Sequence, residues 1–253
     1  MNSSQLSNWA HTVRRLLSVV ILPAAVLLVP VLLAPALGQE PAQAQVSPEL
    51  QRVLSQMDQT AANFRTTQAA FEWDQYQKVV DETDVQKGMV YFRRAGNEVQ
   101  MAAEINDPTS PKTVLFTDSK VEIYQPKIDQ VTRYNTGKDR AAFESFLVLG
   151  FGGSGRDMLK SFDVKYIGPE KVNGADTAKL ELVPKSPKVR NTFDHIWLWI
   201  DPSRGVSVQQ QLFEPSGDYR LAKYSDIQLN QKIPETVFKL KTTGKTKIVS
   251  PQG

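Results

Sequence analysis

The sequence contains no cysteine and only two histidines, and these gaps exclude several classes of protein. Without cysteine there is no disulfide framework, no thiolate metal ligand and no cysteine nucleophile. The chain also cannot carry a lipidated N-terminal cysteine, so it is not itself a lipoprotein. Only His195 follows the N-terminal apolar run, beside "IWLWI", which is more typical of a strand start than of a catalyst. We expect no metal site, no cofactor and no catalytic residue.

The net charge of the chain gives no indication of a strongly basic or acidic partner. Lys and Arg number 30 against 27 Asp and Glu, a net charge of +3. Such a balance provides no electrostatic footprint for nucleic acid, so no nucleic-acid partner is expected.

Residues 1–44 have the composition of a secretory signal peptide. Arg14 and Arg15 precede an uncharged apolar run, 16–33, and small-residue processing sites follow at 36–38 and 42–44. We predict cleavage near 38 or 44. The alternative is an uncleaved membrane anchor, because the run reaches the lower edge of a membrane-spanning length. The prolines within it, together with the processing sites, favour cleavage.

Residues 47–64 have the pattern of one amphipathic helix. Ser47 is a suitable N-cap and Pro48 suits the first helical position. A single apolar stripe, which must pack on another element, follows at helical spacing: Leu50, Val53, Leu54, Met57, Ala61 and Phe64.

From Thr66 onward the apolar period changes to two residues, which is typical of strands. Short alternating segments up to 236–241 are separated by turn signals such as Asn173-Gly174. No long helix alternates with them, so a doubly wound parallel sheet is not expected. We predict a mainly β (α+β) chain with about 10 or 11 antiparallel strands in meander order.

The segment 139–160 interrupts this pattern and contains "GFGGSG" (150–155), which matches the dinucleotide-binding pattern G-x-G-x-x-G. That pattern requires a strand before it and a long helix after it. Here the spacing predicts a short apolar helix over 139–149 and a second over 155–160, with Ser154 as its N-cap. We therefore interpret the glycines as a flexible joint that serves movement of a lid.

Several strands carry large apolar side chains on both faces. A sheet with helices on one side cannot hide both faces unless it curls, so we predict an incomplete, strongly curved antiparallel barrel. Helices would cover its concave apolar face and leave a cavity suited to an acyl chain. The candidate cavity residues are Leu50, Leu54, Met57, Phe71, Trp73, Tyr91, Met101, Phe116, Tyr124, Phe143, Phe146, Leu147, Trp197 and Trp199.

Over 47–249 the chain resembles the periplasmic outer-membrane lipoprotein carrier family, the LolA-like proteins. The resemblance starts with the N-terminal helix leading into "AAFEW" and continues in "GMVYFRRAG" (88–96) and "YQPKIDQV" (124–131). It ends with "WLWIDPSRG" and with "DIQLNQKIPETVFKLKTTGKTKIV". The order and spacing of these strings together carry the resemblance.

The resemblance implies a single lipid-binding half-barrel domain over 45–253, located in the periplasm and monomeric. It implies as cargo the acyl chains of lipoproteins or related lipids, shuttled toward the outer membrane. The donor would be an inner-membrane ABC transporter complex and the acceptor an outer-membrane receptor. Arg94 matches the family arginine that hydrogen-bonds toward the lid and helps govern its opening.

Two alternatives remain open. The first is a periplasmic sensor or regulatory protein of the same fold, which would sense lipids or mislocalised lipoproteins. The second is an enzyme that uses Glu72 and Asp74, which lie about 7 Å apart on one strand face. Surface solvation explains these two carboxylates more simply.

Overall fold

The strands form one sheet, antiparallel except at one edge, that curves without closing. The computed structural model describes residues 47–96, 98–118, 120–135 and 149–250. Residues 44–253 belong to one compact unit. The predicted signal peptide, and the helix expected over 139–149 with Phe143, Phe146 and Leu147, lie outside the described residues; only Leu149 of that helix is described, in a turn. No helix within the described ranges is long and apolar enough to cross a membrane.

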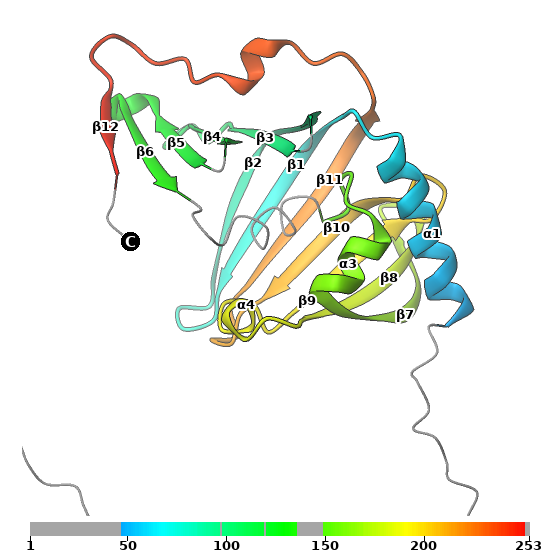
Figure 1. The fold of residues 1–253 in the computed structure, drawn as a ribbon. Helices are drawn as coiled ribbons and strands as arrows, with labels where there is room; N and C mark the ends of the chain where they lie inside the picture. The colour runs from blue at the N-terminus through cyan, green and yellow to red at the C-terminus, as the bar shows by residue number, and fades with distance from the viewer. Residues whose placement is uncertain (1–46, 97, 119, 136–148, 251–253) are drawn as a thin grey trace, which may run out of the picture. The chain divides into compact units, whose positions relative to one another are not determined.

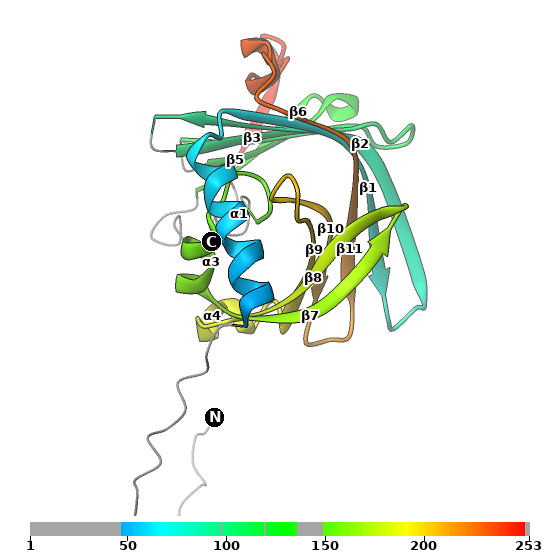
Figure 2. The same cartoon turned by 90° about the vertical axis from the view of Figure 1, so that its right-hand side faces the viewer.

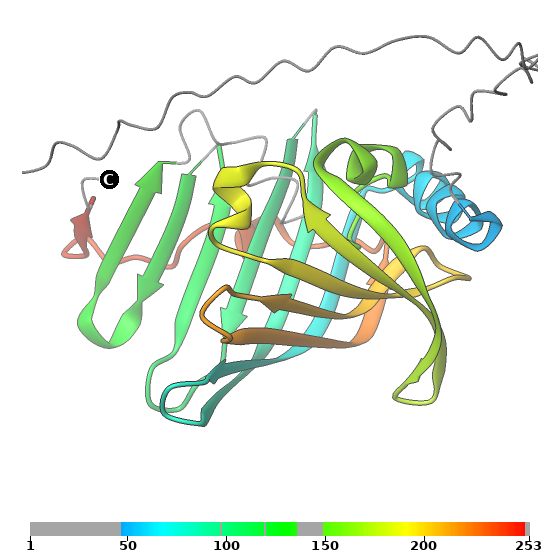
Figure 3. The ribbon, with the colours of Figure 1, turned by 90° about the horizontal axis from the view of Figure 1, so that it is seen from below.

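Within the described residues the sheet has twelve strands, in the order β12-β6-β5-β4-β3-β2-β1-β11-β10-β9-β8-β7 (Figure 1). Viewed from below, β12 and β7 lie at opposite ends of the curved sheet (Figure 3). The predicted incomplete barrel is therefore confirmed. The strands are β1 (Thr66–Gln77), β2 (Glu82–Ala95), β3 (Glu98–Ile105), β4 (Lys112–Thr117), β5 (Lys120–Gln125), β6 (Gln130–Asn135), β7 (Phe162–Val172), β8 (Ala175–Pro184), β9 (His195–Asp201), β10 (Val206–Phe213), β11 (Tyr219–Leu229) and β12 (Lys247–Val249).

Two details of the predicted strands were wrong. The segment 236–241 is not a strand, because η3 (Glu235–Phe238) is a 3₁₀ turn. The additional strand is β12, which pairs in parallel with β6 rather than antiparallel. The described residues also include the short helical elements η1 (Pro126–Ile128) and α4 (Pro187–Arg190).

Helix α1 (Pro48–Ala62) forms as predicted and fills one half of the concave side. The Ser47 side chain accepts a hydrogen bond from the Leu50 amide at 3.2 Å, which caps the helix. The buried stripe of α1 packs with α3 (Gly155–Ser161) against the concave face of β8 and β9 (Figure 2). The cluster includes Leu50, Val53, Leu54, Met57, Met158, Phe162, Leu180, Leu182, Ile196, Leu198 and Ile200. Each buried side chain of this kind contributes on the order of 2 kcal/mol before conformational entropy is counted.

The glycine-rich segment before α3 is closely packed. Gly150 and Gly152 have φ angles of +78° and +84°, which favour glycine. A Cβ at Gly150 would overlap the Ser207 side chain, and one at Gly152 would overlap the Phe64 ring. Phe151 between them is 1% exposed. These glycines therefore permit tight contacts, which corrects their interpretation as a flexible joint.

The start of α3 follows the predicted capping pattern. The Ser154 Oγ accepts a hydrogen bond from the Asp157 amide at 3.0 Å. Phe151 stacks on Phe92 with ring centroids 5.0 Å apart and meets the edge of Tyr224 at 4.7 Å. The segment thus anchors α3 to the floor of the sheet.

The chain after β11 crosses the convex side and fastens the opposite edge. Phe238 and its apolar neighbours pack on Ala102 and Leu115. Farther along, Asp129 accepts hydrogen bonds from the hydroxyls of Thr243 (2.7 Å), Thr246 (2.6 Å) and Tyr124 (3.2 Å). These hydrogen bonds form the Asp129 clasp, which places β12 beside β6. The apolar segment before it covers the convex face of β3 and β4.

Gly155 tests the close packing of α3 on α1. A Cβ on Gly155 would lie 2.6 Å from the Leu54 carbonyl oxygen. Gly155→Ala should therefore lower the free energy of unfolding by about 2 kcal/mol. Gly244→Ala is the control, because nothing lies within 4 Å of a Cβ there. Equal stability of the two variants in urea denaturation would contradict tight packing.

Asp129 should make the clasp sensitive to acid. Its hydrogen bonds from the Thr246 and Thr243 hydroxyls hold its pKa below the usual value. The stabilisation is therefore present above about pH 4 and lost as the pH falls through the lowered pKa. Asp129→Asn keeps the left-handed backbone (φ +45°) but removes the charge. We expect faster amide exchange at Lys247–Val249 and a flatter stability profile below pH 4. Unchanged exchange would exclude the clasp.

Candidate functional site

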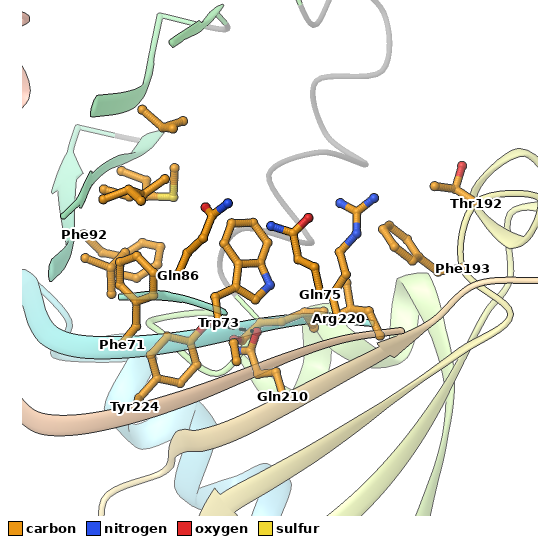
Figure 4. Close-up of a pocket in the computed structure, with 18 of the residues that line it drawn as sticks. Phe71, Trp73, Gln75, Gln86, Phe92, Thr192, Phe193, Gln210, Arg220 and Tyr224 are labelled. Carbon is orange, nitrogen blue, oxygen red and sulfur yellow. Dashed lines mark hydrogen bonds between the residues drawn. The ribbon is translucent and has the colours of Figure 1, made fainter. Parts of the chain in front are cut away.

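The half of the concave face that α1 does not fill forms a pocket of about 770 Å³. Its walls come from β1 to β5, β10, β11 and the α4 region, and part of it is shown in Figure 4. This volume lies within the range of small-molecule and cofactor sites. The lining residues are Phe71, Trp73, Gln75, Gln86, Val90, Phe92, Met101, Ala103, Ile105, Lys112, Val114, Ile123, Leu149, Ser186, Lys188, Val189, Thr192, Phe193, Gln210, Leu212, Arg220, Ala222 and Tyr224.

One end of the pocket is almost entirely apolar because the inward positions of β2 to β5 carry apolar residues. Cross-strand pairing places Phe92 beside Met101, Val90 beside Ala103, and Val114 beside Ile123. Phe71 extends this wall onto β1, opposite Gly88. A Cβ on Gly88 would lie 3.0 Å from the Phe71 ring, so glycine leaves room for that ring.

The other end of the pocket is polar and lies toward α4. Gln75 and Arg220 are Cα partners across β1 and β11, and their side chains stand next to each other in Figure 4. The Arg220 guanidinium lies 5.7 Å from the Phe193 ring centre. Its Nε donates to Glu214 Oε1 at 3.0 Å. The pocket is therefore amphipathic along its length.

The floor contains two polar groups that are already hydrogen-bonded. Tyr224 donates from its hydroxyl to Gln210 Oε1 at 3.4 Å, and Gln210 donates from Nε2 to the Leu149 carbonyl. Burial raises the pKa of the Tyr224 phenol well above its usual value, so this group stays protonated. The floor is thus neutral and joins the sheet to the glycine-rich segment.

Three of the described candidate residues line this pocket, namely Phe71, Trp73 and Met101. Phe116 is the cross-strand neighbour of Met101 but is only 2% exposed and does not line the pocket. Leu50, Leu54 and Met57 face the closed core below α1 instead.

Four aromatic candidates lie on the convex side, so their assignment to the cavity was wrong. Trp197 and Trp199 alternate with Leu198, which faces the core, and Lys179 lies over both indole rings at 3.9 and 4.6 Å. Tyr91 packs below the C-terminal segment. Tyr124 is also outside the pocket and belongs to the Asp129 clasp. The sequence prediction chose these residues because they are large and aromatic, but the strand register places their side chains outside the pocket.

Arg94 joins the end of α1 to the glycine-rich segment. Its guanidinium donates to the carbonyls of Phe64 (3.4 Å), Ala61 (3.5 Å) and Gly152 (3.5 Å). It also lies 5.8 Å from the Phe64 ring centre. Arg94 is therefore placed at the junction of the helix and the segment before α3.

Glu72 and Asp74 are held by cations on the convex face. Lys223 Nζ lies 2.9 Å from a carboxylate oxygen of each, and Lys87 lies 2.8 Å from Glu72. The hydrogen bonds from Lys87 and Lys223 lower the pKa of Glu72 to about 2. Both carboxylates alternate with Trp73, so they point away from the pocket. His195 stacks on Phe213 with ring centroids 4.2 Å apart, as suits a strand-start histidine.

The pocket residues that sequence reasoning missed fall into two groups. Val90, Phe92, Val114 and Ile123 are the inward apolar set, and the alternation in these strands could have identified them. Arg220 belongs to the polar end, and no local pattern marks it. Its role follows only from the pairing of β11 with β1.

Comparison with known proteins agrees with this architecture. The family model described as outer membrane lipoprotein carrier protein LolA matches residues 62–241. No curated protein matches the chain. An uncharacterized conserved protein from Thermus thermophilus is 12% identical, with 80% of this chain and 99% of that chain covered and a TM-score of 0.51. This likeness shows a shared fold.

Two further solved structures are more distant. A LolA superfamily protein from Nitrosomonas europaea is 15% identical, covers 76% of this chain and 97% of its own, and has a TM-score of 0.38. The Mycobacterium tuberculosis lipoprotein LppX is 11% identical, with 74% and 98% covered and a TM-score of 0.43. The match of the family model spans most of the chain, and the protein therefore belongs to the LolA family of outer membrane lipoprotein carrier proteins.

Proposed function

We propose that this protein is a periplasmic carrier that binds the acyl chains of lipoproteins or related lipids and shuttles them toward the outer membrane. The observation that carries the proposal is the pocket of about 770 Å³ with one apolar end, enclosed by the curved sheet. Membership of the LolA family supports the same function.

The pocket can bind a chain by apolar area alone. Each buried methylene contributes about 0.8 kcal/mol, so a chain of ~12 methylenes provides on the order of 10 kcal/mol before ordering costs. The apolar wall can hold an occupant without reacting with it. It is formed by Phe71, Val90, Phe92, Met101 and Val114. The carboxylate pair that could serve an enzyme is engaged in ion pairs on the other face. The geometry therefore supports a holding function.

Delivery requires a donor, an acceptor and a way to release the occupant. We include in the proposal an inner-membrane ABC transporter complex as donor and an outer-membrane receptor as acceptor. Arg94 is the proposed gating residue, because its three carbonyl contacts join the end of α1 to the glycine-rich segment. Loss of these contacts would separate the helix from that segment.

Trp73 and Trp197 form a matched pair for testing lipid binding. Both are half-buried tryptophans, but only Trp73 lines the pocket. Trp73→Ala should weaken binding of a fluorescent fatty-acyl probe about tenfold through lost apolar contact, and Trp197→Ala by less than about twofold. Native mass spectrometry of the purified protein should also show bound acylated material. No probe binding and no bound lipid would overturn the proposed function.

Arg94 and Arg93 provide a second pair with opposite orientations. Arg93 lies over the Phe238 ring at 4.1 Å and pairs with Glu235 on the convex side. Arg94→Met should speed amide exchange at the C-terminal end of α1, because the Ala61 and Phe64 carbonyls lose a charged donor. It should also speed release of the probe. Arg93→Met should leave both quantities unchanged, and identical behaviour of the two variants would remove the gating role.

A further inference from the structure

We propose that the polar end of the pocket binds the carboxylate of a single-chain amphiphile, so that the preferred occupant is a long-chain fatty acid. This inference rests on the proposed function, because the apolar end must hold the chain. It goes further by assigning the chemistry of the head group.

Arg220 supplies the main attraction for a carboxylate. Its Nε and Nη2 edge faces Glu214, with both nitrogens 3.0 Å from Oε1. Its Nη1 donates no hydrogen bond to any described residue, and the guanidinium extends into the pocket (Figure 4). Arginine carries five N–H donors, so a second acceptor can bind without displacing Glu214.

Gln75 adds a neutral donor beside that guanidinium. The two residues are Cα partners on adjacent strands, and both line the pocket. The side-chain amide of Gln75 forms no hydrogen bond within the described part of the chain, although the residue is half-buried. No atom of this amide is both buried and unpaired, so a ligand can reach it. A ligand oxygen between the Gln75 amide and Arg220 Nη1 would satisfy both.

The signs of the surrounding charges favour an anion of low charge. Among the described lining residues the charged ones are Arg220, Lys112 and Lys188, and all three are basic. Two of the described carboxylates lie close by. Glu214 forms an ion pair with Arg220, and Asp84 accepts a hydrogen bond from Gln86 Nε2 at 2.8 Å. Asp84 is the Cα partner of Gln75 on the side away from Arg220. A monoanion would therefore lie on the Arg220 side, whereas a dianion would meet two negative neighbours.

The position of the polar end sets the orientation of the chain. Phe193 borders Arg220 at the α4 side, while Val114 and Ile123 line the far wall. Three strands separate β4 from β11 in the sheet. At about 4.8 Å per strand spacing, the two ends are roughly 19 Å apart along the sheet, which is the length scale of an acyl chain. The head group would lie at Arg220 and the chain would extend across Trp73.

Calorimetric titration at pH 8 with dodecanoate and dodecanol tests the assignment, because the two differ only in the head group. Dodecanoate should bind at least about tenfold more tightly than dodecanol. Arg220→Gln should remove most of this difference, as expected for loss of a charge-assisted hydrogen bond. Glu214→Gln should instead tighten dodecanoate binding about threefold, because the negative charge beside Arg220 is removed.

The two variants break the same ion pair, so a purely structural effect would have the same sign in both. Lys165→Gln is the charge-matched control, because Lys165 is exposed on β7 and does not line the pocket; it should change dodecanoate affinity by less than about twofold. Equal affinity for dodecanoate and dodecanol, unaffected by Arg220→Gln, would overturn this inference but leave the proposed function intact. No binding of either ligand would overturn the proposed function itself. Lysophosphatidylglycerol with a dodecanoyl chain is the last ligand. If it binds more tightly than dodecanoate, and Arg220→Gln weakens that binding, the carboxylate assignment is overturned in favour of a phosphodiester head group.

Discussion

The packing of α1 and α3 into one half of the curved sheet is the constraint on which the rest of the structure depends. It closes the concave face of β7 to β9 and leaves the concave face of β1 to β5 open. The contact is tight at Gly155, where a Cβ would overlap Leu54, and Gly150 and Gly152 pack equally closely on Ser207 and Phe64. Phe151 transmits this packing to Phe92 and Tyr224, which form the pocket boundary. Helix, glycine-rich segment and pocket therefore form one connected unit.

The convex face explains why a half-barrel with so many apolar residues can remain ordered in water. The C-terminal segment covers Ala102 and Leu115, and the Asp129 clasp fixes its end. Elsewhere on that face, Lys223 forms ion pairs with Glu72 and Asp74. Lys179 lies over the rings of Trp197 and Trp199 and shields them from water. Apolar residues on the convex face are thus covered by other parts of the protein. Only those on the concave face can line a binding site.

The proposed function depends on a division of chemistry within the pocket. In this proposal the β2 to β5 wall provides area for a chain, and Arg220 of β11 together with Gln75 of β1 provides donors for a head group. A carrier must bind by many weak contacts and then release its occupant, so a long apolar wall with few polar groups suits the task. Arg94 lies at the junction where the closed half meets the glycine-rich segment, and this is the place of its proposed gating role.

The sequence by itself determined the elements and the family. The Ser47 cap, the α1 stripe and the alternation in β1 to β11 are local patterns, and local physical chemistry is sufficient to predict them. Tertiary structure alone decided which face of each strand lines the pocket. Trp197 and Tyr91 were misplaced because alternation separates two faces without indicating which is concave. Arg220 became part of the site only through pairing with Gln75, 145 positions earlier in the chain, a contact that no local pattern encodes.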